Sequence, residues 1–351
     1  MIRAAWLRAR GQSGAAAAGL FAVALVALVT GPRLAHLYST TVGAAGAGSD
    51  VAREFTRTDR PLALALNAVV LVVPALVGLF WGAPLVASEL ESGTYRLAWT
   101  QSVSRTRWLA ARLAVVGGTT ALAAGLVSLT VSWWAAPLDR ARDAPFATFD
   151  SRGIVPIGYA LFAFALAVAL GALLRSALPA IVTGLVAFVA VRLCANHWLR
   201  PRYLAPLHRS LPLDPNSTGY GSSGNALFGI PPSTLQPEAP DIPRAWITSV
   251  SVLDRSGARL DGTTLASTCP DLVANAHSGP PAGVKAGPVP ADAVATMRGC
   301  VERVGVRYHE AVSYQPGRRY WAFQGMELGV YLVAAGLAVG FCFWLVRRRL
   351  V

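Results

Sequence analysis

Six long stretches of apolar residues, almost free of charge, constrain the fold of this chain more than any other feature of its sequence. They are Ala15–Thr30, Leu62–Leu85, Leu109–Ala136, Ile154–Leu174, Leu178–Leu199 and Ala322–Val346. Apolar residues make up 54% of the 351 and charged residues only 14%, an excess that a soluble core of this size does not bury. Since about 20 apolar residues in a helix cross the hydrocarbon of a bilayer, we predict an all-α polytopic membrane protein with six transmembrane helices.

A cleaved leader is the alternative interpretation of the first stretch, because Arg3, Arg8 and Arg10 precede it. The apolar character resumes at Leu34, and no small-x-small cleavage site closes the stretch. Both observations favour a helix that is retained.

Residues 1–14 are predicted to form an interfacial N-terminal helix. Ile2, Ala5, Trp6 and Ala9 fall on one helical stripe beside the three arginines, a pattern that suits a helix lying among lipid headgroups. A disordered basic tail is the alternative.

Arginine positions predict the orientation, because short basic loops are retained on the cytoplasmic side. With six spans, four groups of arginines fall on one side: Arg3, Arg8 and Arg10; Arg96, Arg105, Arg107 and Arg112; Arg175; and Arg347–Arg349. We therefore expect a multi-pass protein of the cell membrane with both termini in the cytoplasm. The formal charge of +13 is explained by these arginines, which favour membrane lipid as a partner and do not call for nucleic acid.

The remaining sequence divides around these spans. Transmembrane helices one to five occupy residues 15–199 and include a cytoplasmic loop at 86–108, while residues 321–351 hold helix six and a basic cytoplasmic tail. The segment Gly31–Pro61 is expected to be an external loop with little fixed structure. Residues 200–320, in which Pro, Gly, Ser, Thr and Asp replace the aliphatic runs, are predicted to be a small α+β extracytoplasmic domain between helices five and six.

Within residues 200–320, three segments have a recognisable pattern. Trp246–Asp254 alternates and is rich in β-branched residues, which predicts a strand, and Val306–Tyr314 predicts another. Pro290–Val304 has helical periodicity. The proline- and glycine-rich stretch Leu211–Pro243 is left without assigned structure.

The four cysteines divide by position. Cys194 and Cys342 lie in apolar stretches and are interpreted as small apolar fillers. Cys269 and Cys300 lie in the predicted extracytoplasmic domain, where a disulfide between them would contribute about 3 kcal/mol. No histidine has metal-ligand spacing with either cysteine, so no metal is expected.

Catalytic motifs are missing from the sequence. There is no Gly-x-x-x-x-Gly-Lys-Ser/Thr phosphate loop, no His-Glu-x-x-His and no Gly-x-Ser-x-Gly. We expect no catalytic residue and no cofactor in this chain, so that any work against a gradient must take its energy from a partner.

The loop after the second span is more polar than a tether needs to be, yet it keeps Leu97, Trp99 and Trp108 as apolar anchors. Gly93 can end the helix that extends from span two, and Ser104 can cap the helix that leads into span three. An amphipathic element at the membrane surface is one interpretation, and an ordinary solvated loop is the other.

A resemblance bears on this choice. The run Glu89-x-Glu91-x-Gly93-Thr94, followed by Gln101-Ser102-Val103-Ser104-Arg105 and Trp108, resembles the loop of actinobacterial permeases of the type-2 ATP-binding-cassette (ABC) exporter class. The segment Tyr314-Gln315-Pro316, Arg319-Tyr320-Trp321-x-Phe323-Gln324 and Glu327 resembles the end of such permeases. The similarity extends over essentially the whole chain.

The resemblance implies the permease subunit of an ATP-driven exporter, working with an ABC ATPase subunit and with a second permease subunit in a homo- or heterodimer. It also implies that the loop at 86–108 is the coupling segment that contacts the ATPase. The residues assigned to this coupling are Glu89, Glu91, Gly93, Thr94, Arg96, Gln101, Ser104 and Arg105. ATP hydrolysis would belong to the partner, and this chain would not be an enzyme.

Among the charges within the predicted spans, Arg192 and Glu327 are the two worth weighing, and both lie near the same membrane face. Intramembrane charges are functional candidates by default, and a polar pair between these two is one interpretation. A structural pair or side chains that extend to the interface are the alternatives. For the chain as a whole, a membrane-anchored sensor or accessory protein with an extracytoplasmic ligand-binding domain is the alternative to an exporter.

Overall fold

The computed structural model describes residues 2–43, 50–58, 60–91, 105–214, 221–222, 235–236, 242–271 and 291–348. The chain forms two compact units. One comprises Met1–Leu204 with Arg318–Val351 and is called the bundle, and the other comprises Ala205–Gly317 and is called the sheet unit.

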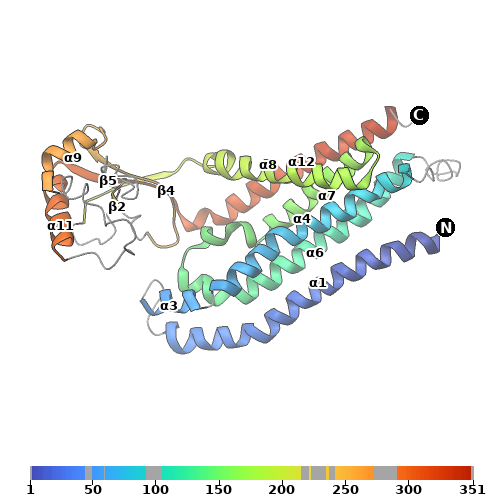
Figure 1. Ribbon diagram of the computed structural model, residues 1–351, viewed down its shortest axis with the longest axis horizontal. Coiled ribbons are helices and arrows are strands. Elements are labelled where there is room, and N and C mark those ends of the chain that lie inside the picture. Colours follow the sequence, from blue (N-terminus) through green and yellow to red (C-terminus); the bar gives the residue numbers. More distant parts are fainter. Residues whose placement is uncertain are drawn as a thin grey trace, which may run out of the picture. The chain divides into compact units, whose positions relative to one another are not determined.

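Within the described residues, six helical segments are long and apolar enough to cross a membrane, which confirms the predicted number. The helices that form them are α1 (Ile2–Leu37), α4 (Arg60–Glu91), α6 (Arg105–Arg142), α7 (Val155–Leu174), α8 (Ala177–Cys194) and α12 (Tyr320–Arg348), as Figure 1 shows.

The most buried helix of the bundle is α7, which packs against α4, α6, α8 and α12. It begins with Pro156 in its first turn, where a missing N–H group costs no helical hydrogen bond. It ends at Leu174, and the left-handed conformation of the next residue, Arg175 (φ 54°), turns the chain toward α8.

Three glycines bring the backbones of α4 and α7 into direct contact. A Cβ atom on Gly78 would lie 2.7 Å from the carbonyl oxygen of Ala160, and one on Gly82 would lie 2.6 Å from that of Phe164. From the other side, a Cβ atom on Gly171 would lie 2.6 Å from the oxygen of Ala83. Close approach through small residues is how helices gain packing energy in lipid, where burying apolar surface against another helix brings no hydrophobic gain.

Helix α1 packs against α6. The indole Nε1 of Trp134 donates a hydrogen bond to Thr30 Oγ1 at 2.7 Å, and Ala27 and Leu34 join an apolar cluster with residues of α4 and α6. Residues 2–14 continue without a break into the rest of α1. The placement of residues 1–14 among lipid headgroups stays a prediction.

The expectation of little fixed structure over Gly31–Pro61 is wrong for the residues described there. Helix α1 runs to Leu37, the π-helical turn η1 (Tyr38–Val42) continues it, and α3 (Asp50–Thr58) follows. The reason is that α3 has an apolar side: Ala52 is buried with Val42 and Ala141 of α6, and Phe55 packs against Tyr38 with ring centroids 6.2 Å apart.

Short segments with non-α geometry connect the helices at one end of the bundle. The 3₁₀ helix η2 (Pro145–Ser151) links α6 to α7. After α8, the π-helical turn η3 (Ala195–Leu199) and the 3₁₀ turn η4 (Arg200–Arg202) follow without interruption. The end of the bundle where these segments lie is called the η2 end.

The sheet unit contains a three-stranded antiparallel sheet in the order β1–β5–β4, with β1 at Leu207–Leu211, β5 at Tyr308–Gln315 and β4 at Trp246–Asp254. A two-stranded sheet pairs β2 (Gly221–Ser222) with β3 (Leu235–Gln236). The strand predicted at Trp246–Asp254 is confirmed with the same bounds, and the one predicted at Val306–Tyr314 is confirmed as β5.

The core of the sheet unit lies around a disulfide. Helix α9 (Gly262–Thr268) is capped by Asp261, whose Oδ1 accepts a hydrogen bond from the backbone N–H of Thr264 at 2.8 Å. Helix α11 (Ala291–Gly305) confirms the predicted helix. The Cys269–Cys300 disulfide is confirmed, with the two Cα atoms 5.4 Å apart, and it joins the end of α9 to α11. The apolar cluster around it contains Leu213, Val252, Leu260, Leu265, Val301 and Val304.

The glycine contact between α4 and α7 yields a prediction. In Gly171→Ala the new methyl group meets backbone atoms of α4, which cannot rotate away, so we expect a loss of about 1–3 kcal/mol in the free energy of unfolding. The measurement is reversible unfolding of the purified protein in mixed micelles.

Gly340→Ala in α12 is the matched control, because no described atom outside its own stretch of helix lies within 4 Å of a Cβ atom built there. It should leave stability unchanged or raise it by roughly 0.5–1 kcal/mol through reduced backbone entropy. Equal effects of the two substitutions would contradict the close approach of α4 and α7.

Candidate functional site

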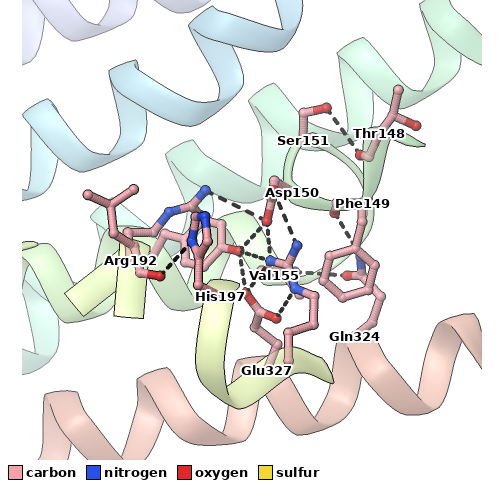
Figure 2. A network of polar contacts seen from close by, with 12 residues as sticks. Thr148, Phe149, Asp150, Ser151, Val155, Arg192, His197, Gln324 and Glu327 are labelled. Atoms are coloured by element: carbon pink, nitrogen blue, oxygen red, sulfur yellow. Dashed lines mark hydrogen bonds and ion pairs between the residues drawn. The ribbon is translucent and has the colours of Figure 1, made fainter. Parts of the chain in front are cut away.

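Charged and polar side chains from five helices and their connections meet at the η2 end of the bundle. Figure 2 shows part of this cluster, with Asp150 of η2, Arg192 of α8 and Glu327 of α12 directed toward one another. The cluster is called the η2 network and consists of Asn67, Asp139, Thr148, Asp150, Ser151, Arg152, Tyr159, Arg192, Arg200, Gln324 and Glu327.

Arg200 lies at the centre of the network and binds two carboxylates. Its Nε donates to Glu327 Oε2 at 2.8 Å and its Nη2 to Glu327 Oε1 at 2.6 Å, which is the paired geometry that a guanidinium and a carboxylate prefer. The same Nη2 contacts Asp150 Oδ1, and Nη1 lies 3.4 Å from Asp150 Oδ2. The side chains of Arg200 and Glu327 are only 8% and 1% exposed, so their charges have to be compensated within the protein.

Tyr159 of α7 joins the two carboxylates on the other side. Its hydroxyl oxygen lies 2.7 Å from Glu327 Oε1 and 2.9 Å from Asp150 Oδ1, so that the single phenolic proton can be donated to either. Three elements, η2, α7 and α12, are therefore fastened together at one point.

Arg192 is the second arginine of the network and is bound much less completely. Its Nη2 lies 3.6 Å from Asp150 Oδ1, and its guanidinium carbon lies 3.8 Å from the centre of the Tyr159 ring, a cation–π contact. The two arginines and the two carboxylates carry equal and opposite formal charge, so this part of the network is neutral overall.

The predicted pairing of Arg192 with Glu327 is corrected by these contacts. Both residues belong to the network, but the ion-pair partner of Glu327 is Arg200 and that of Arg192 is Asp150. The reason is positional: the π-helical turn η3 carries the chain on to Arg200, which approaches Glu327 closely enough for two hydrogen bonds.

A second ion pair attaches η2 to the neighbouring helices. Arg152 donates from Nε to Asp139 Oδ2 of α6 at 3.0 Å and from Nη1 to Asn67 Oδ1 of α4 at 2.8 Å. The Ser151 hydroxyl also donates to Asn67 Oδ1, at 3.0 Å. Arg152 therefore links α4 and α6 to the segment that carries Asp150.

Gln324 of α12 completes the network by capping α7. Its Oε1 accepts hydrogen bonds from the backbone N–H groups of Ile154 and Val155 at 3.0 and 3.1 Å, and its Nε2 donates to the carbonyl of Phe149 at 3.0 Å. The first N–H groups of a helix have no partner within the helix, and here a neighbouring span supplies one. Gly153 (φ 68°) makes room, because a Cβ atom there would lie 2.7 Å from Gln324 Oε1.

The predicted coupling residues lie apart from this network, at the other ends of α4 and α6. Glu89 and Glu91 belong to the last turn of α4, and Arg105 is the first residue of α6. Gly93, Thr94, Arg96, Gln101 and Ser104 lie outside the described residues.

The sequence indicated Arg192 and Glu327 but not their partners. Asp139, Asp150 and Arg152 lie at or beyond the end of a span, in a stretch with no motif, and Arg200 falls at the boundary of the predicted extracytoplasmic domain. One signal was available: an intramembrane charge needs a counter-charge at the same depth, and Asp150 is in a short connection on the same side as Arg192.

The Arg200–Glu327 pair can be tested with a double-mutant cycle. Because each substitution leaves a buried charge uncompensated, Arg200→Met and Glu327→Gln should each lower the free energy of unfolding by about 3–5 kcal/mol. The double variant should lose less than the sum by at least about 1 kcal/mol. The measurement is unfolding in mixed micelles.

Arg202→Met is the control for the loss of an arginine near Arg200. The Arg202 side chain is exposed and donates a hydrogen bond to the carbonyl of Trp198. It should change stability by less than about 0.5 kcal/mol. Strict additivity of the Arg200 and Glu327 substitutions would refute the pair.

Comparison with known proteins agrees with the six apolar helices. Residues 17–200, more than half of the 351, match the family described as ABC-2 membrane transporter related. This stretch includes four of the six candidate spans, all but the last two residues of a fifth, and the network residues from Asn67 to Arg200. No curated protein and no solved structure gives a match. The chain therefore belongs to the ABC-2 membrane transporter related family and is a multi-pass membrane protein of the permease type.

Proposed function

We propose that this chain is the transmembrane permease subunit of an ATP-driven exporter in which a separate ABC ATPase subunit hydrolyses the nucleotide. The observation that carries the proposal is the family match, because residues 17–200 include the segment 86–108 and both helices that flank it. The sequence of this chain contains no phosphate loop, so nucleotide hydrolysis is assigned to the partner. A second permease subunit, identical or different, completes the transporter.

The helices that flank segment 86–108 pack against each other beside it. Val86 of α4 and Leu109 of α6 share one buried apolar cluster, and Nη1 of Arg112 lies 3.4 Å from the carbonyl oxygen of Leu85. A force on the segment would consequently displace α4 and α6 together. This is the mechanical property that a coupling segment needs.

The opposite ends of the same two helices meet at Arg152. Asn67 of α4 and Asp139 of α6 both accept hydrogen bonds from its guanidinium. In the proposed cycle, movement of α4 and α6 reaches η2 through Arg152 and acts next on Asp150, which shares Arg200 with Glu327. The η2 network is thereby the element that responds to ATP-driven movement.

The proposed orientation places segment 86–108 in the cytoplasm and the sheet unit outside the cell. The Cys269–Cys300 disulfide supports this orientation, because disulfides persist in oxidising compartments and are rare in the cytosol. The arginine distribution supports it independently.

The coupling can be tested with the permease co-expressed with candidate cassette ATPases from the same genome. Glu89→Ala, Glu91→Ala and Arg105→Ala should each reduce permease-dependent ATP hydrolysis at least fivefold, because they remove charges from the proposed contact surface. Hydrolysis is measured on the complex purified in nanodiscs.

The matched control is Arg347→Ala, which removes an exposed charge that lies on the same side of the membrane in the proposed orientation. It should leave hydrolysis unchanged. If the chain never co-purifies with an ATPase, or if the three variants behave like the control, the export proposal fails and a sensor or accessory role becomes the better hypothesis.

Orientation is tested separately by labelling with a membrane-impermeant maleimide, in a Cys194→Ala background that removes the exposed free thiol. Arg209→Cys, on the exposed part of β1, should react in intact cells. Arg105→Cys should react only after permeabilisation. The reverse pattern would invert the proposed topology.

A further inference from the structure

Asp150 is the member of the η2 network that two arginines share (Figure 2). Nη2 of Arg200 contacts its Oδ1, and Nη1 of Arg200 lies 3.4 Å from its Oδ2. Nη2 of Arg192 lies 3.6 Å from the same Oδ1. A hydrogen bond between a guanidinium and a carboxylate is about 2.7–2.9 Å long, so Arg192 is attracted by Asp150 without being hydrogen-bonded to it.

Arg192 has bonding capacity that this arrangement does not use. Among the described residues, its Nη1 is one of four buried side-chain atoms without a hydrogen-bond partner. The ring of Tyr159, whose centre lies 3.8 Å from the guanidinium carbon, compensates part of the charge. A guanidinium whose side chain is 20% exposed is compensated better by a carboxylate at hydrogen-bond distance.

Arg200, in contrast, does not depend on Asp150 for compensation. It holds both oxygens of Glu327 at 2.8 and 2.6 Å, and its guanidinium carbon lies 4.5 Å from the centre of the Phe149 ring. If Asp150 turned to Arg192, the bonds between Arg200 and Glu327 would remain. The result would be two separate neutral ion pairs, so neither arrangement leaves a buried charge without a counter-charge. Two arrangements of similar free energy are what a two-state element requires.

The segment that carries Asp150 is bound on its two sides to different helices. The carbonyl of Phe149 accepts a hydrogen bond from Gln324 of α12 at 3.0 Å. Ser151 and Arg152 donate to Asn67 Oδ1 of α4 at 3.0 and 2.8 Å. A displacement of α4 relative to α12 would therefore turn the backbone at the residue between these bonds. An approach of about 0.5–1 Å would bring Asp150 within hydrogen-bond distance of Arg192.

The backbone of η2 allows such a turn. Asp143, before η2, and Gly153, after it, both have left-handed conformations, with φ of 47° and 68°. Thr148 inside η2 departs from helical geometry (φ −119°, ψ 21°). The segment is therefore not a rigid extension of α6 or of α7, and it can change orientation while both helices stay intact.

We propose that Asp150 exchanges its arginine partner, from Arg200 to Arg192, when α4 moves relative to α12. In the exchanged arrangement Asp150 and Arg192 form a hydrogen-bonded ion pair, and Arg200 keeps Glu327. The attachment of η2 thereby moves from η4 to α8. The exchange rests on the proposed function for the source of the movement, whereas the capacity of Arg192 to replace Arg200 is a property of this chain alone.

The first test uses the full-length chain without a partner subunit and measures the midpoint of thermal unfolding. Arg192→Gln alone should lower it by less than about 2 °C, because it removes only a contact at 3.6 Å. In the double variant Arg200→Met with Glu327→Gln, Arg192 is the arginine left for Asp150. There the same substitution should lower the midpoint by at least about 4 °C more.

Arg202→Gln is the matched control for the first test, because Arg202 is exposed and lies near the same end of the bundle. It should lower the midpoint by less than about 2 °C in both backgrounds. Equal effects of Arg192→Gln in the two backgrounds would contradict the exchange. So would a loss from Arg192→Gln alone as large as that from Arg200→Met, since Arg192 would then already have a complete partner.

The second test measures permease-dependent ATP hydrolysis by the complex in nanodiscs, and it decides the matter where the double variant does not fold. Arg192→Gln should reduce hydrolysis at least about fivefold although the chain alone unfolds normally. Arg192→Lys, which keeps the charge, should retain more hydrolysis than Arg192→Gln, and Arg202→Gln should retain all of it. Full hydrolysis by Arg192→Gln would overturn the exchange.

The two tests separate the exchange from the proposed function. If the unmodified complex shows no permease-dependent hydrolysis, the export proposal fails, and the unfolding midpoints of the chain alone still decide whether Asp150 turns to Arg192. If hydrolysis is normal in the unmodified complex and in Arg192→Gln, the export proposal stands and the exchange is wrong.

Discussion

The sharing of Arg200 between Asp150 and Glu327 is the interaction on which the arrangement of the η2 end depends. Each of these groups would cost several kcal/mol to take out of water alone, and together they compensate one another. The contact joins η4, η2 and α12, and the neighbouring bonds of Arg152 and Gln324 extend it to α4, α6 and α7. Removing any one partner would leave an uncompensated charge in a low-dielectric interior. The helices at this end therefore hold one another in place.

The remainder of the bundle is held by packing of a different kind. Along α4 and α7 the contact surface is made by glycine and alanine, which allow the two backbones to touch. Such packing holds two helices in a fixed relative position and needs no polar side chain between them. Charged contacts are concentrated at the η2 end, while close apolar packing predominates along the helices. The closely packed pair of α4 and α7 therefore ends at a cluster of individual hydrogen bonds and ion pairs, the η2 network.

Much of this architecture could be predicted from the sequence. The number of membrane helices follows from the length of apolar runs, and β4 follows from alternation over Trp246–Asp254. The Cys269–Cys300 disulfide follows from two cysteines outside the spans. These features depend on local pattern or on elimination, for which one sequence is enough.

The partners in the η2 network could not be predicted in the same way. Glu327 contacts Arg200 and Tyr159, which are 127 and 168 residues away in the sequence. The periodicity of a sequence carries no information about contacts between residues so far apart. The error over Gly31–Pro61 has a similar origin, since the apolar side of α3 is stabilised by Val42 and Ala141 rather than by its own composition. The assignment of segment 86–108 as the coupling segment rests on the family, and the side of the membrane that it faces is inferred from the arginine positions. Both stay predictions.

The π-helical turn η3 determines the direction in which Arg200 leaves α8. In an uninterrupted α-helix, residues eight positions apart, such as Arg192 and Arg200, lie about 80° apart around the axis. Over Ala195–Leu199 the winding is looser, each residue advances through a smaller angle, and both guanidiniums reach Asp150. The winding of this turn is therefore constrained independently of the chemistry of its residues: regular α-helical winding over the same number of residues would turn Arg200 away from Glu327 without altering either member of the pair.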